Sequence, residues 1–297
     1  MTAKIGFIGA GKVGYGFGRH ITERGNRGCA KSGFEVAGYV SRDKASACEA
    51  AAFAGGRAYG SAAGLAAESD LLLLTVPDGA IAEAWRQMSD ELLDRQARRG
   101  RPLCIGHCSG SLGARVFGPR PLDANIFFGS IHPLAAIYDR TSAYKKLDGA
   151  FFTTEGDEPF AHFAGELLSA LGNPFREIDA AQKTLYHAAS VMVSNLVCAL
   201  AYAGTKTFKA CGLDDAFAES AWRALFLENA ENIAALGPVL ALTGPVERAD
   251  AATAARHLEA LSGDERESYL LLSRILAEAA QKKNPSRDYS EMKTLLK

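Results

Sequence analysis

The sequence predicts an α/β protein of two domains. Residues 1–157 are expected to form a doubly wound, mostly parallel sheet, and residues 158–297 an all-α domain. The chain has 297 residues, about twice the ~150 residues typical of one domain. In the first part, apolar runs of strand length alternate with helical spacing, which is typical of a parallel sheet covered on both faces. Beyond Asp157 the β-branched runs stop, and helical periodicity continues.

The individual elements follow from the same patterns. Short apolar runs predict strands, and amphipathic spacing with glycine or proline at its ends predicts helices. The expected strands are 4–9, 34–40, 71–76, 102–107, 125–131 and 151–154, with helices from the end of the first strand to about Arg24, over 43–54 and over 81–88. The expected helices of the second domain are 159–171, 180–211, 214–236, 249–261 and 264–283.

Composition excludes several classes of protein. Lys and Arg number 33 against 34 Asp and Glu, so the net charge of −1 gives no general attraction to nucleic acid. The apolar stretch Ala188–Gly204 is shorter than the ~20 residues of a membrane span, so we expect a buried core helix and no membrane partner. The six cysteines form no CxxC pair or zinc spacing, which predicts free thiols, no metal and a cytoplasmic location.

A glycine motif follows the first predicted strand and opens a helix. It reads Gly9-Ala10-Gly11-Lys12-Val13-Gly14. In a dinucleotide-binding fold, the first glycine allows the tight turn, the second admits the pyrophosphate, and the third allows close helix–strand packing. The helix N-terminus adds partial positive charge at the phosphates. These residues therefore predict a Rossmann-type cofactor site.

The end of the second predicted strand selects the form of the cofactor. An NAD site places a carboxylate there to accept from the ribose hydroxyls. Here Ser41 and Arg42 occupy this position and can bind a 2′-phosphate, whereas Asp43 comes later and can cap the next helix. We therefore expect NADP(H). The loop Val76-Pro77-Asp78 after the third long strand is expected to line the nicotinamide side, with helix capping as the alternative role of Asp78.

Two further strand ends carry candidate catalytic groups. Ser109 follows the strand that ends at His107, and it could hold a substrate carboxylate or carbonyl. Capping of a short helix is its alternative role. His132 ends the next strand just before Pro133 and could exchange a proton in the reaction, unless it only pins a loop.

The long helix predicted over 180–211 carries a polar stripe. Lys183, His187, Ser190 and Ser194 recur at helical spacing among apolar residues. His187 and Lys183 are candidates for a general acid, and the whole stripe together with Asn195 is a candidate substrate surface. A polar dimer contact is the alternative. Arg248, between two later helices, could bind an anionic group or pair with Asp250.

Taken together, these motifs resemble a bacterial family of Rossmann-like NADP oxidoreductases whose second domain has no known function. The matching residues span nearly the whole chain in the family's order: Ile5–Gly14, Ser41-Arg42, Thr75–Asp78, His107–Gly110, His132–Leu134, Tyr186–Ser190, Ser194-Asn195, Leu242–Val246, Arg248, Asp250 and His257-Leu258.

The family is similar to the larger group of 6-phosphogluconate, prephenate and pyrroline-5-carboxylate dehydrogenases and reductases. That resemblance implies a 6-phosphogluconate dehydrogenase-like helical domain that often dimerises, with the active site between domains. The turn at His132 also resembles that of prephenate dehydrogenases, but Ala135-Ala136 replaces their glycine, which argues against prephenate as the substrate.

We therefore expect a cytoplasmic, homodimeric NADP(H)-dependent oxidoreductase that transfers a hydride between nicotinamide and a small carboxylate-bearing substrate. In this hypothesis Ser109 orients the substrate, and His132 or His187 moves the proton. Two alternatives remain open. One is a sensor or scaffold that binds NADP(H) without turnover, and the other is an imine reductase of the pyrroline-5-carboxylate type.

Overall fold

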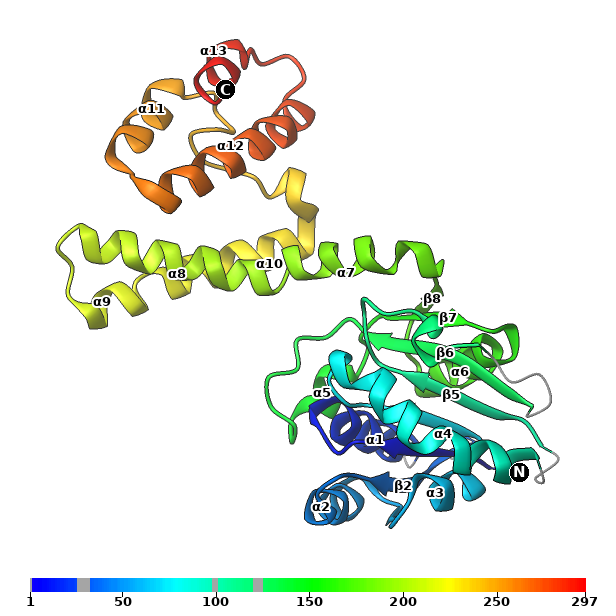
Figure 1. The fold of residues 1–297 in the computed structure, drawn as a ribbon. Helices are drawn as coiled ribbons and strands as arrows, with labels where there is room; N and C mark the ends of the chain where they lie inside the picture. Colours follow the sequence, from blue (N-terminus) through cyan, green and yellow to red (C-terminus); the bar gives the residue numbers. More distant parts are fainter. Residues whose placement is uncertain (1, 26–32, 98–100, 120–124) are drawn as a thin grey trace. The chain divides into compact units, whose positions relative to one another are not determined.

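The protein contains two compact units, Met1–Ser194 and Asn195–Lys297 (Figure 1). The computed structural model describes residues 2–25, 33–97, 101–119 and 125–297. The first unit holds a mixed sheet with flanking helices, and the second is helical. This arrangement confirms the predicted fold class, an α/β sheet followed by a helix-rich region.

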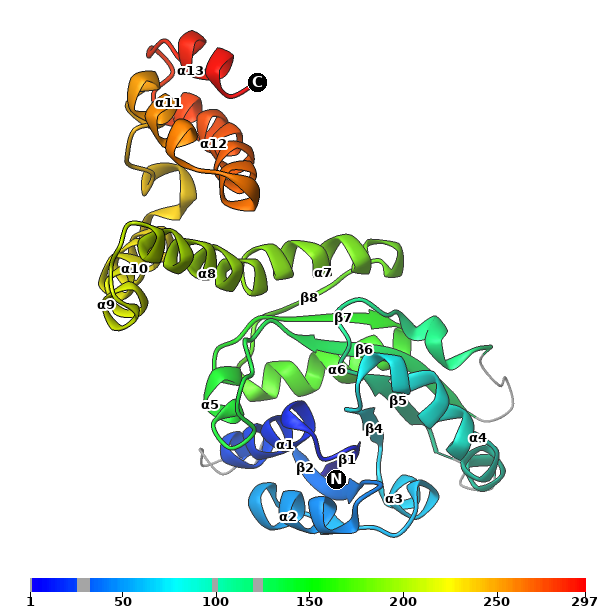
Figure 2. The same ribbon diagram turned by 60° about the vertical axis from the view of Figure 1, so that its left-hand side comes forward.

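The sheet of the first unit has the order β3-β2-β1-β4-β5-β6-β7-β8 (Figure 2). Neighbouring strands run parallel except β6 and β7, which are antiparallel. The part from β3 to β6 follows the 3-2-1-4-5-6 pattern of doubly wound dinucleotide-binding sheets. The strands are β1 Ala3–Ile8, β2 Phe34–Val40, β3 Arg57–Ala58, β4 Leu71–Leu74, β5 Leu103–His107, β6 Ile126–Pro133, β7 Phe152–Gly156 and β8 Phe175–Glu177.

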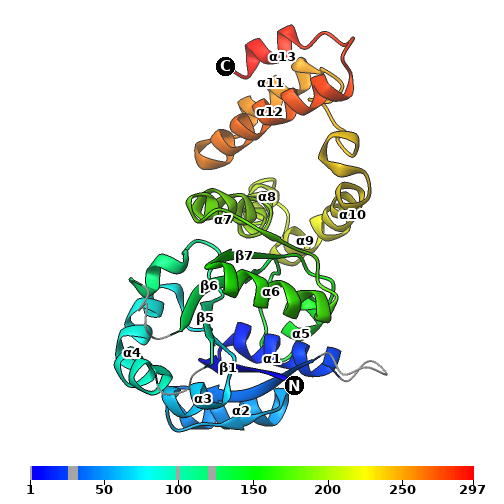
Figure 3. The ribbon, with the colours of Figure 1, turned by 90° about the vertical axis from the view of Figure 1, so that its right-hand side faces the viewer.

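Helices cover both faces of this sheet (Figure 3). On β4, Leu71 and Leu73 join the core under α1, α2 and α6, while Leu72 and Leu74 join the core under α3 and α4. This alternation explains why a strand of four leucines has no polar face. The helices are α1 Lys12–Gly25, α2 Lys44–Ala54, α3 Ala62–Glu68, α4 Ile81–Ala97, α5 Ala143–Leu147, α6 Glu158–Leu171 and α7 Lys183–Met192.

The long helix predicted over 180–211 is interrupted. A 3₁₀ turn over Ala180–Gln182 leads into α7, which ends at Met192, and α8 begins at Asn195. At the break, the hydroxyls of Ser190 and Ser194 donate to the carbonyl oxygens of Tyr186 and Ser190 one turn earlier. Such bonds compete with the helical ladder and bend helices.

The prediction of a buried core helix over Ala188–Gly204 is also wrong for the chain by itself. Val193 is 80% exposed, Tyr202 70% and Leu196 50%. By length and composition alone, the helical stretch Ala180–Ala210 is apolar enough to cross a membrane, and none of its most apolar part is buried. In α7, the polar Lys183 is buried instead, which is the opposite of a core helix.

The second unit packs around a small core of its own. The core joins α11, α12 and α13 through Ala254, Leu258, Ala277, Ala280 and Met292. Glycine and proline interrupt α10 where the sequence predicts a break, with Gly237 at φ +78°. The helices are α8 Asn195–Ala210, α9 Asp215–Ser220, α10 Trp222–Leu240, α11 Ala251–Ala260, α12 Gly263–Lys283 and α13 Ser290–Leu295.

Along the chain, the boundary between the two compact units falls between Ser194 and Asn195, later than the predicted domain boundary at residue 157. The difference arises because α6 packs on the sheet and β8 extends it beyond β7. A compact unit is defined by contacts and a domain by independent folding. The boundary at residue 157 therefore stays a prediction.

Candidate functional site

The glycine loop lies where the sequence places it, between β1 and α1. Gly9 adopts φ +103°, a conformation that favours glycine, and a Cβ on Gly14 would lie 2.3 Å from Thr75 Oγ1. Thr75 Oγ1 donates to Gly9 O at 2.8 Å, so the end of β4 fixes the loop. The loop is thus held in one shape, with the N-terminus of α1 beside it.

A cavity of about 520 Å³ opens over this loop. Seven of the predicted cofactor residues line it: Gly9, Ala10, Gly11, Ser41, Arg42, Val76 and Pro77. Lys12, Val13, Gly14 and Asp78 lie outside its lining. Thr75, which opens the predicted loop, also lines the cavity. Sequence reasoning missed three polar residues of the lining, Ser46 on α2 and Glu83 and Gln87 on α4, which only the turns of these helices bring to the cavity.

The end of β2 offers a cation and hydroxyls rather than a carboxylate. Arg42 is exposed and forms no ion pair with any residue in the described ranges. The carboxylate of Asp43 caps α2 by accepting from the N–H groups of Ala45 and Ser46. The hydrogen bond from the Ser46 hydroxyl, together with these two N–H bonds, lowers the pKa of Asp43. The donors of Ser41 and Arg42 therefore fit a 2′-phosphate, and Asp43 takes the capping role that its position in the sequence allowed.

Asp78 and Ser109 bind each other across the ends of β4 and β5. Ser109 Oγ donates to Asp78 Oδ2 at 2.6 Å and accepts from the N–H groups of Ser111 and Leu112. Ser111 Oγ donates to the same carboxylate at 3.3 Å. Ser109 is 4% exposed, and its bonds favour the turn-capping role over a direct substrate contact. Its part in the reaction stays a prediction. Asp78 is the first residue of a 3₁₀ turn, Asp78–Ala80, and Pro77 holds the N-cap position of that turn.

His107 is buried at the end of β5. Its Nδ1 accepts from the N–H of Ser109 at 3.2 Å, and Nε2 lies 3.4 Å from Gly113 O. Burial, with Lys183 nearby, lowers the pKa of His107 to about 4. This histidine holds the turn that carries Ser109.

One face of the β6–β7 pair forms a polar floor. Ser130 pairs with Glu155 across the antiparallel strands, and His132 pairs with Thr153. Directly opposed residues point to the same face, so these four side chains lie together. On the opposite face, a Cβ on Gly129 would meet the Phe160 ring of α6, which shows that this side is closed by packing.

Lys183 enters this floor from α7. It is 1% exposed, and its Nζ donates to Ser130 Oγ at 2.7 Å and to Ser109 O at 3.1 Å. Ser130 Oγ donates in turn to Glu155 Oε2 at 3.2 Å, and the N–H of Ala114 also donates to this carboxylate. Burial lowers the pKa of Lys183, and the Glu155 charge opposes that effect. Lys183 therefore links three segments of the first unit.

His132 and His187 face each other beside Gly110. Their ring centroids are 6.0 Å apart, and a Cβ on Gly110 would lie 2.5 Å from His187 Cδ2 and 2.8 Å from His132 Nε2. His132 Nδ1 lies 2.8 Å from the hydroxyl of Tyr186. Burial, with Lys183 and His187 nearby, lowers the pKa of His132 to about 4. The structure thus brings both predicted histidines together with Ser109 and Lys183.

The remaining members of the predicted substrate set are divided between the two units. The hydroxyls of Ser190 and Ser194 donate to backbone carbonyl oxygens of α7. Asn195 is the first residue of α8, in the second unit. Arg248 is exposed in the second unit, on the loop before α11. Sequence reasoning missed Tyr186, Thr153 and Glu155, which only the strand register and the turn of α7 bring to His132 and Lys183.

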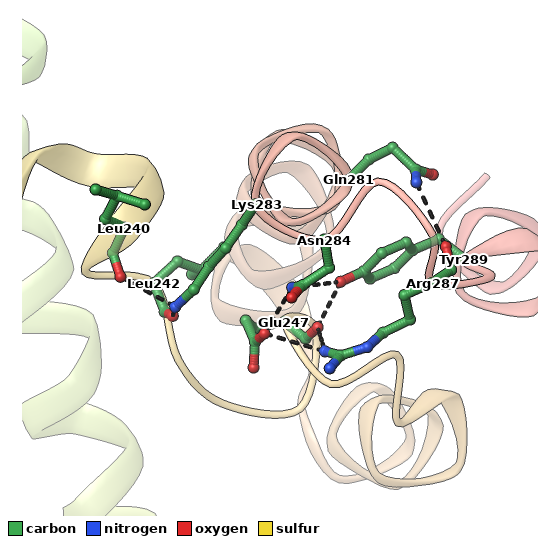
Figure 4. A network of polar contacts seen from close by, with 8 residues as sticks. All are labelled: Leu240, Leu242, Glu247, Gln281, Lys283, Asn284, Arg287 and Tyr289. Atoms are coloured by element: carbon green, nitrogen blue, oxygen red, sulfur yellow. Dashed lines mark hydrogen bonds and ion pairs between the residues drawn. The ribbon is translucent and has the colours of Figure 1, made fainter.

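The loop that carries Arg248 is tightly held within the second unit (Figure 4). Glu247 Oε1 accepts from Asn284 Nδ2 at 2.7 Å and from Arg287 Nη1 at 3.0 Å. Lys283 Nζ donates to Leu242 O at 2.6 Å. Ala249 adopts φ +60°, an uncommon conformation for alanine. These hydrogen bonds hold the segment that precedes Arg248, whose own side chain is exposed.

A doubly wound sheet with a glycine loop after its first strand defines a dinucleotide-binding domain, and family matches make the class more specific. Residues 4–97 match the family described as NADP oxidoreductase coenzyme F420-dependent, and residues 150–275 match a domain of unknown function, DUF2520. The chain thus joins an N-terminal domain of the NADP oxidoreductase family to a C-terminal DUF2520 domain, which confirms the resemblance seen in its motifs.

Solved structures support the same fold. Protein TM1727 from Thermotoga maritima has a TM-score of 0.70 and 23% identity, covering 94% of this chain and 99% of that chain. BF3122 from Bacteroides fragilis, described as a candidate NADP oxidoreductase, has a TM-score of 0.66 and 22% identity, with 93% and 98% covered.

An imine reductase from Pseudomonas sp. has a TM-score of 0.63 and 14% identity, with 95% and 98% covered. Pyrroline-5-carboxylate reductases share the fold as well. No curated protein sequence matches the chain.

Proposed function

We propose that this protein is an NADP(H)-dependent oxidoreductase that transfers a hydride between nicotinamide and a small carboxylate-bearing substrate. The observation that carries the proposal is that one unit holds two groups of residues: a fixed glycine loop with the Ser41–Arg42 donors in one cavity, and two neighbouring histidines, His132 on β6 and His187 on α7. The family match to NADP oxidoreductases supports it.

The residues present fit the cofactor. Gly9, Gly11 and the N-terminus of α1 would hold the pyrophosphate, and Ser41 and Arg42 the 2′-phosphate, with Ser46 close by. When bound, NADPH supplies the hydride. The chain supplies the rest: Lys183 fixes the Ser109 loop against the sheet, and His132 and His187 offer ring nitrogens to the substrate.

The cofactor assignment is tested by nucleotide titration. Wild-type protein is expected to bind NADPH more tightly than NADH, and Arg42→Ala to weaken NADPH binding by about ten- to a hundredfold, as a charged hydrogen bond of ~1.5–3 kcal/mol implies. NADH affinity should barely change. Arg140→Ala is the matched control, because that exposed guanidinium pairs with Glu49 instead. Equal affinities for both nucleotides, or unchanged NADPH binding in Arg42→Ala, would overturn the assignment.

The charge state of His132 favours an imine over a carbonyl as the reducible group. Reduction of a carbonyl requires a proton for the oxygen, whereas an iminium ion arrives already protonated. With a pKa of about 4, His132 is neutral near pH 7 and is a poor source of that proton. Single-turnover oxidation of NADPH with matched panels of cyclic imines and ketones separates these reactions, and faster turnover of the imines is expected.

A second copy of this chain is the partner that we propose. In the described residues, all exposed large hydrophobic side chains except Leu134, Tyr138 and Phe151 lie at or beyond Leu185. An apolar surface of this kind needs a cover. Lys183 ties α7 to the sheet, which favours a protein cover over a lipid one. An active site between domains with Arg248 as an anion contact, the cytoplasmic location, and the absence of membrane and nucleic-acid partners stay predictions.

A further inference from the structure

Tyr186 contacts the ring nitrogen of His132 that points away from Gly110. Its hydroxyl lies 2.8 Å from Nδ1, and the two rings meet edge to face at 5.6 Å between centroids. Tyr186 follows Lys183 by three residues on α7, so both side chains lie on the helix face that meets the β6–β7 floor. The buried bonds of Lys183 therefore also fix the position of the phenol.

The direction of this hydrogen bond decides which nitrogen of His132 carries the proton. If the phenol donates, Nδ1 accepts and the ring proton is on Nε2. If Nδ1 donates, the phenol hydrogen needs another acceptor. Burial raises the pKa of Tyr186, and the nearby hydroxyls of Thr153 and Ser190 oppose that effect, but within the described part of the chain only His132 Nδ1 lies in full hydrogen-bond geometry with the phenol. Donation by the phenol therefore pairs its hydrogen with the acceptor that has the best geometry.

On the opposite side of the ring, Nε2 lies beside Gly110 and close to the His187 ring. The Thr153 side chain, directly across from His132, is 5% exposed, and its hydroxyl is in full hydrogen-bond geometry with no residue that the structure describes, although it is close enough to Tyr186 to act on the pKa of that phenol. A water or ligand atom that completed the bonding of this buried hydroxyl would be stabilising.

We propose that Tyr186 is a positioning residue that holds His132 as the neutral tautomer protonated at Nε2, so that the ring donates a hydrogen bond to a substrate acceptor atom. This inference rests on the proposed reductase function, because it defines what His132 does there. A neutral imidazole still donates from its one N–H, and an oxygen of the substrate carboxylate can accept this bond. Of the charged and titratable groups around the ring, Lys183, His187 and His107 disfavour its protonation, and Asp78 favours it.

The tautomer can be measured directly by NMR. We would label the histidines with ¹⁵N, record long-range ¹H–¹⁵N correlations at pH 7, and assign His132 from the signals lost in His132→Gln. The expected wild-type pattern is a protonated Nε2 and an unprotonated Nδ1. In Tyr186→Phe, Nδ1 loses its donor, so both nitrogens are expected to shift toward the average of two exchanging tautomers.

The chain provides a matched control. His257 Nδ1 lies 2.8 Å from the Tyr269 hydroxyl, with ring centroids 5.6 Å apart, so Tyr269→Phe removes the same bond in the second unit. This variant is expected to change the signals of His257 and leave those of His132. A wild-type His132 that is protonated at Nδ1, or charged, would overturn the inference even if Tyr186→Phe fails to fold. Unchanged His132 signals in folded Tyr186→Phe would overturn it as well.

Turnover gives a separate readout. If the proposed reaction holds, Tyr186→Phe is expected to lower kcat by about two- to tenfold, the effect of losing one neutral hydrogen bond of ~0.5–1.5 kcal/mol, with NADPH affinity unchanged. Absence of turnover in the wild type on every imine and ketone would count against the proposed function. The NMR result needs neither nucleotide nor substrate, so the two failures are distinguishable.

Discussion

At the scale of single residues, Gly110 determines how closely the two histidines can approach the loop after β5. A Cβ at this position would lie within 2.9 Å of three ring atoms, two on His132 and one on His187. We expect Gly110→Ala to lower the free energy of unfolding by about 1–3 kcal/mol, because both rings sit in packed surroundings. Gly60→Ala, where no atom lies within 4 Å, is the control. Chemical denaturation measures both, and equal losses would contradict the prediction.

Lys183 and Glu155 are coupled through Ser130, and this coupling predicts a non-additive pair of substitutions. Lys183→Met leaves a carboxylate buried beside Ser130 without its cation, so we expect a loss of about 3–5 kcal/mol in the free energy of unfolding. Adding Glu155→Gln removes the uncompensated charge and is expected to recover part of that loss. Denaturant titration of the two single variants and the double variant gives the coupling. Additive losses would show that the two charges are independent.

At the scale of elements, the sequence predicted best where one pattern had one structural solution. The four leucines of β4 and the glycine loop are examples, because no other arrangement buries both faces of the strand or places three glycines at the turn. The polar stripe of α7 was recognised, but periodicity cannot say whether a stripe faces solvent or a sheet. Tyr186 was missed because its role depends on a contact with His132, which lies 54 residues earlier in the sequence.

His107, at the end of β5, is expected to make the free energy of unfolding fall at acidic pH. His107 is fully buried, and its pKa is lowered from 6.5 to about 4. The unfolded chain therefore binds a proton near pH 6.5 that the folded chain takes up only near pH 4. This contribution to stability is fully present above about pH 6.5 and is lost as the pH falls toward 4, by up to ~1.4 kcal/mol per pH unit for one proton.

Denaturant unfolding between pH 4 and 7 tests this prediction. The slope of the free energy of unfolding against pH is expected to be smaller in His107→Asn than in the wild type. His162→Asn is the control for removal of an exposed histidine, because that side chain is 75% exposed. A His107→Asn profile parallel to the wild-type profile would show that this histidine contributes no proton linkage.

At the scale of the whole molecule, the near-zero net charge places anion recognition in local groups. The chain carries 33 basic and 34 acidic residues, so no general field attracts a dinucleotide. The cavity over the glycine loop instead gathers a helix N-terminus, Ser41 and Arg42. Exposed hydrophobicity is also local, because most of the large apolar side chains that are exposed in the described residues lie at or beyond Leu185.

That concentration predicts the oligomeric state. A stable interface buries about 1,200–2,000 Å² and is richest in apolar side chains at its centre, so the wild type is expected to sediment as a dimer. Leu185 and Val193, 69% and 80% exposed, are the positions at which a charge should do most damage. We expect Leu185→Glu combined with Val193→Glu to give monomers in analytical ultracentrifugation. Tyr138→Glu, at a 76% exposed site before this stretch, should remain dimeric. A monomeric wild type, or flotation of the wild type with lipid vesicles, would show that another partner covers the apolar surface.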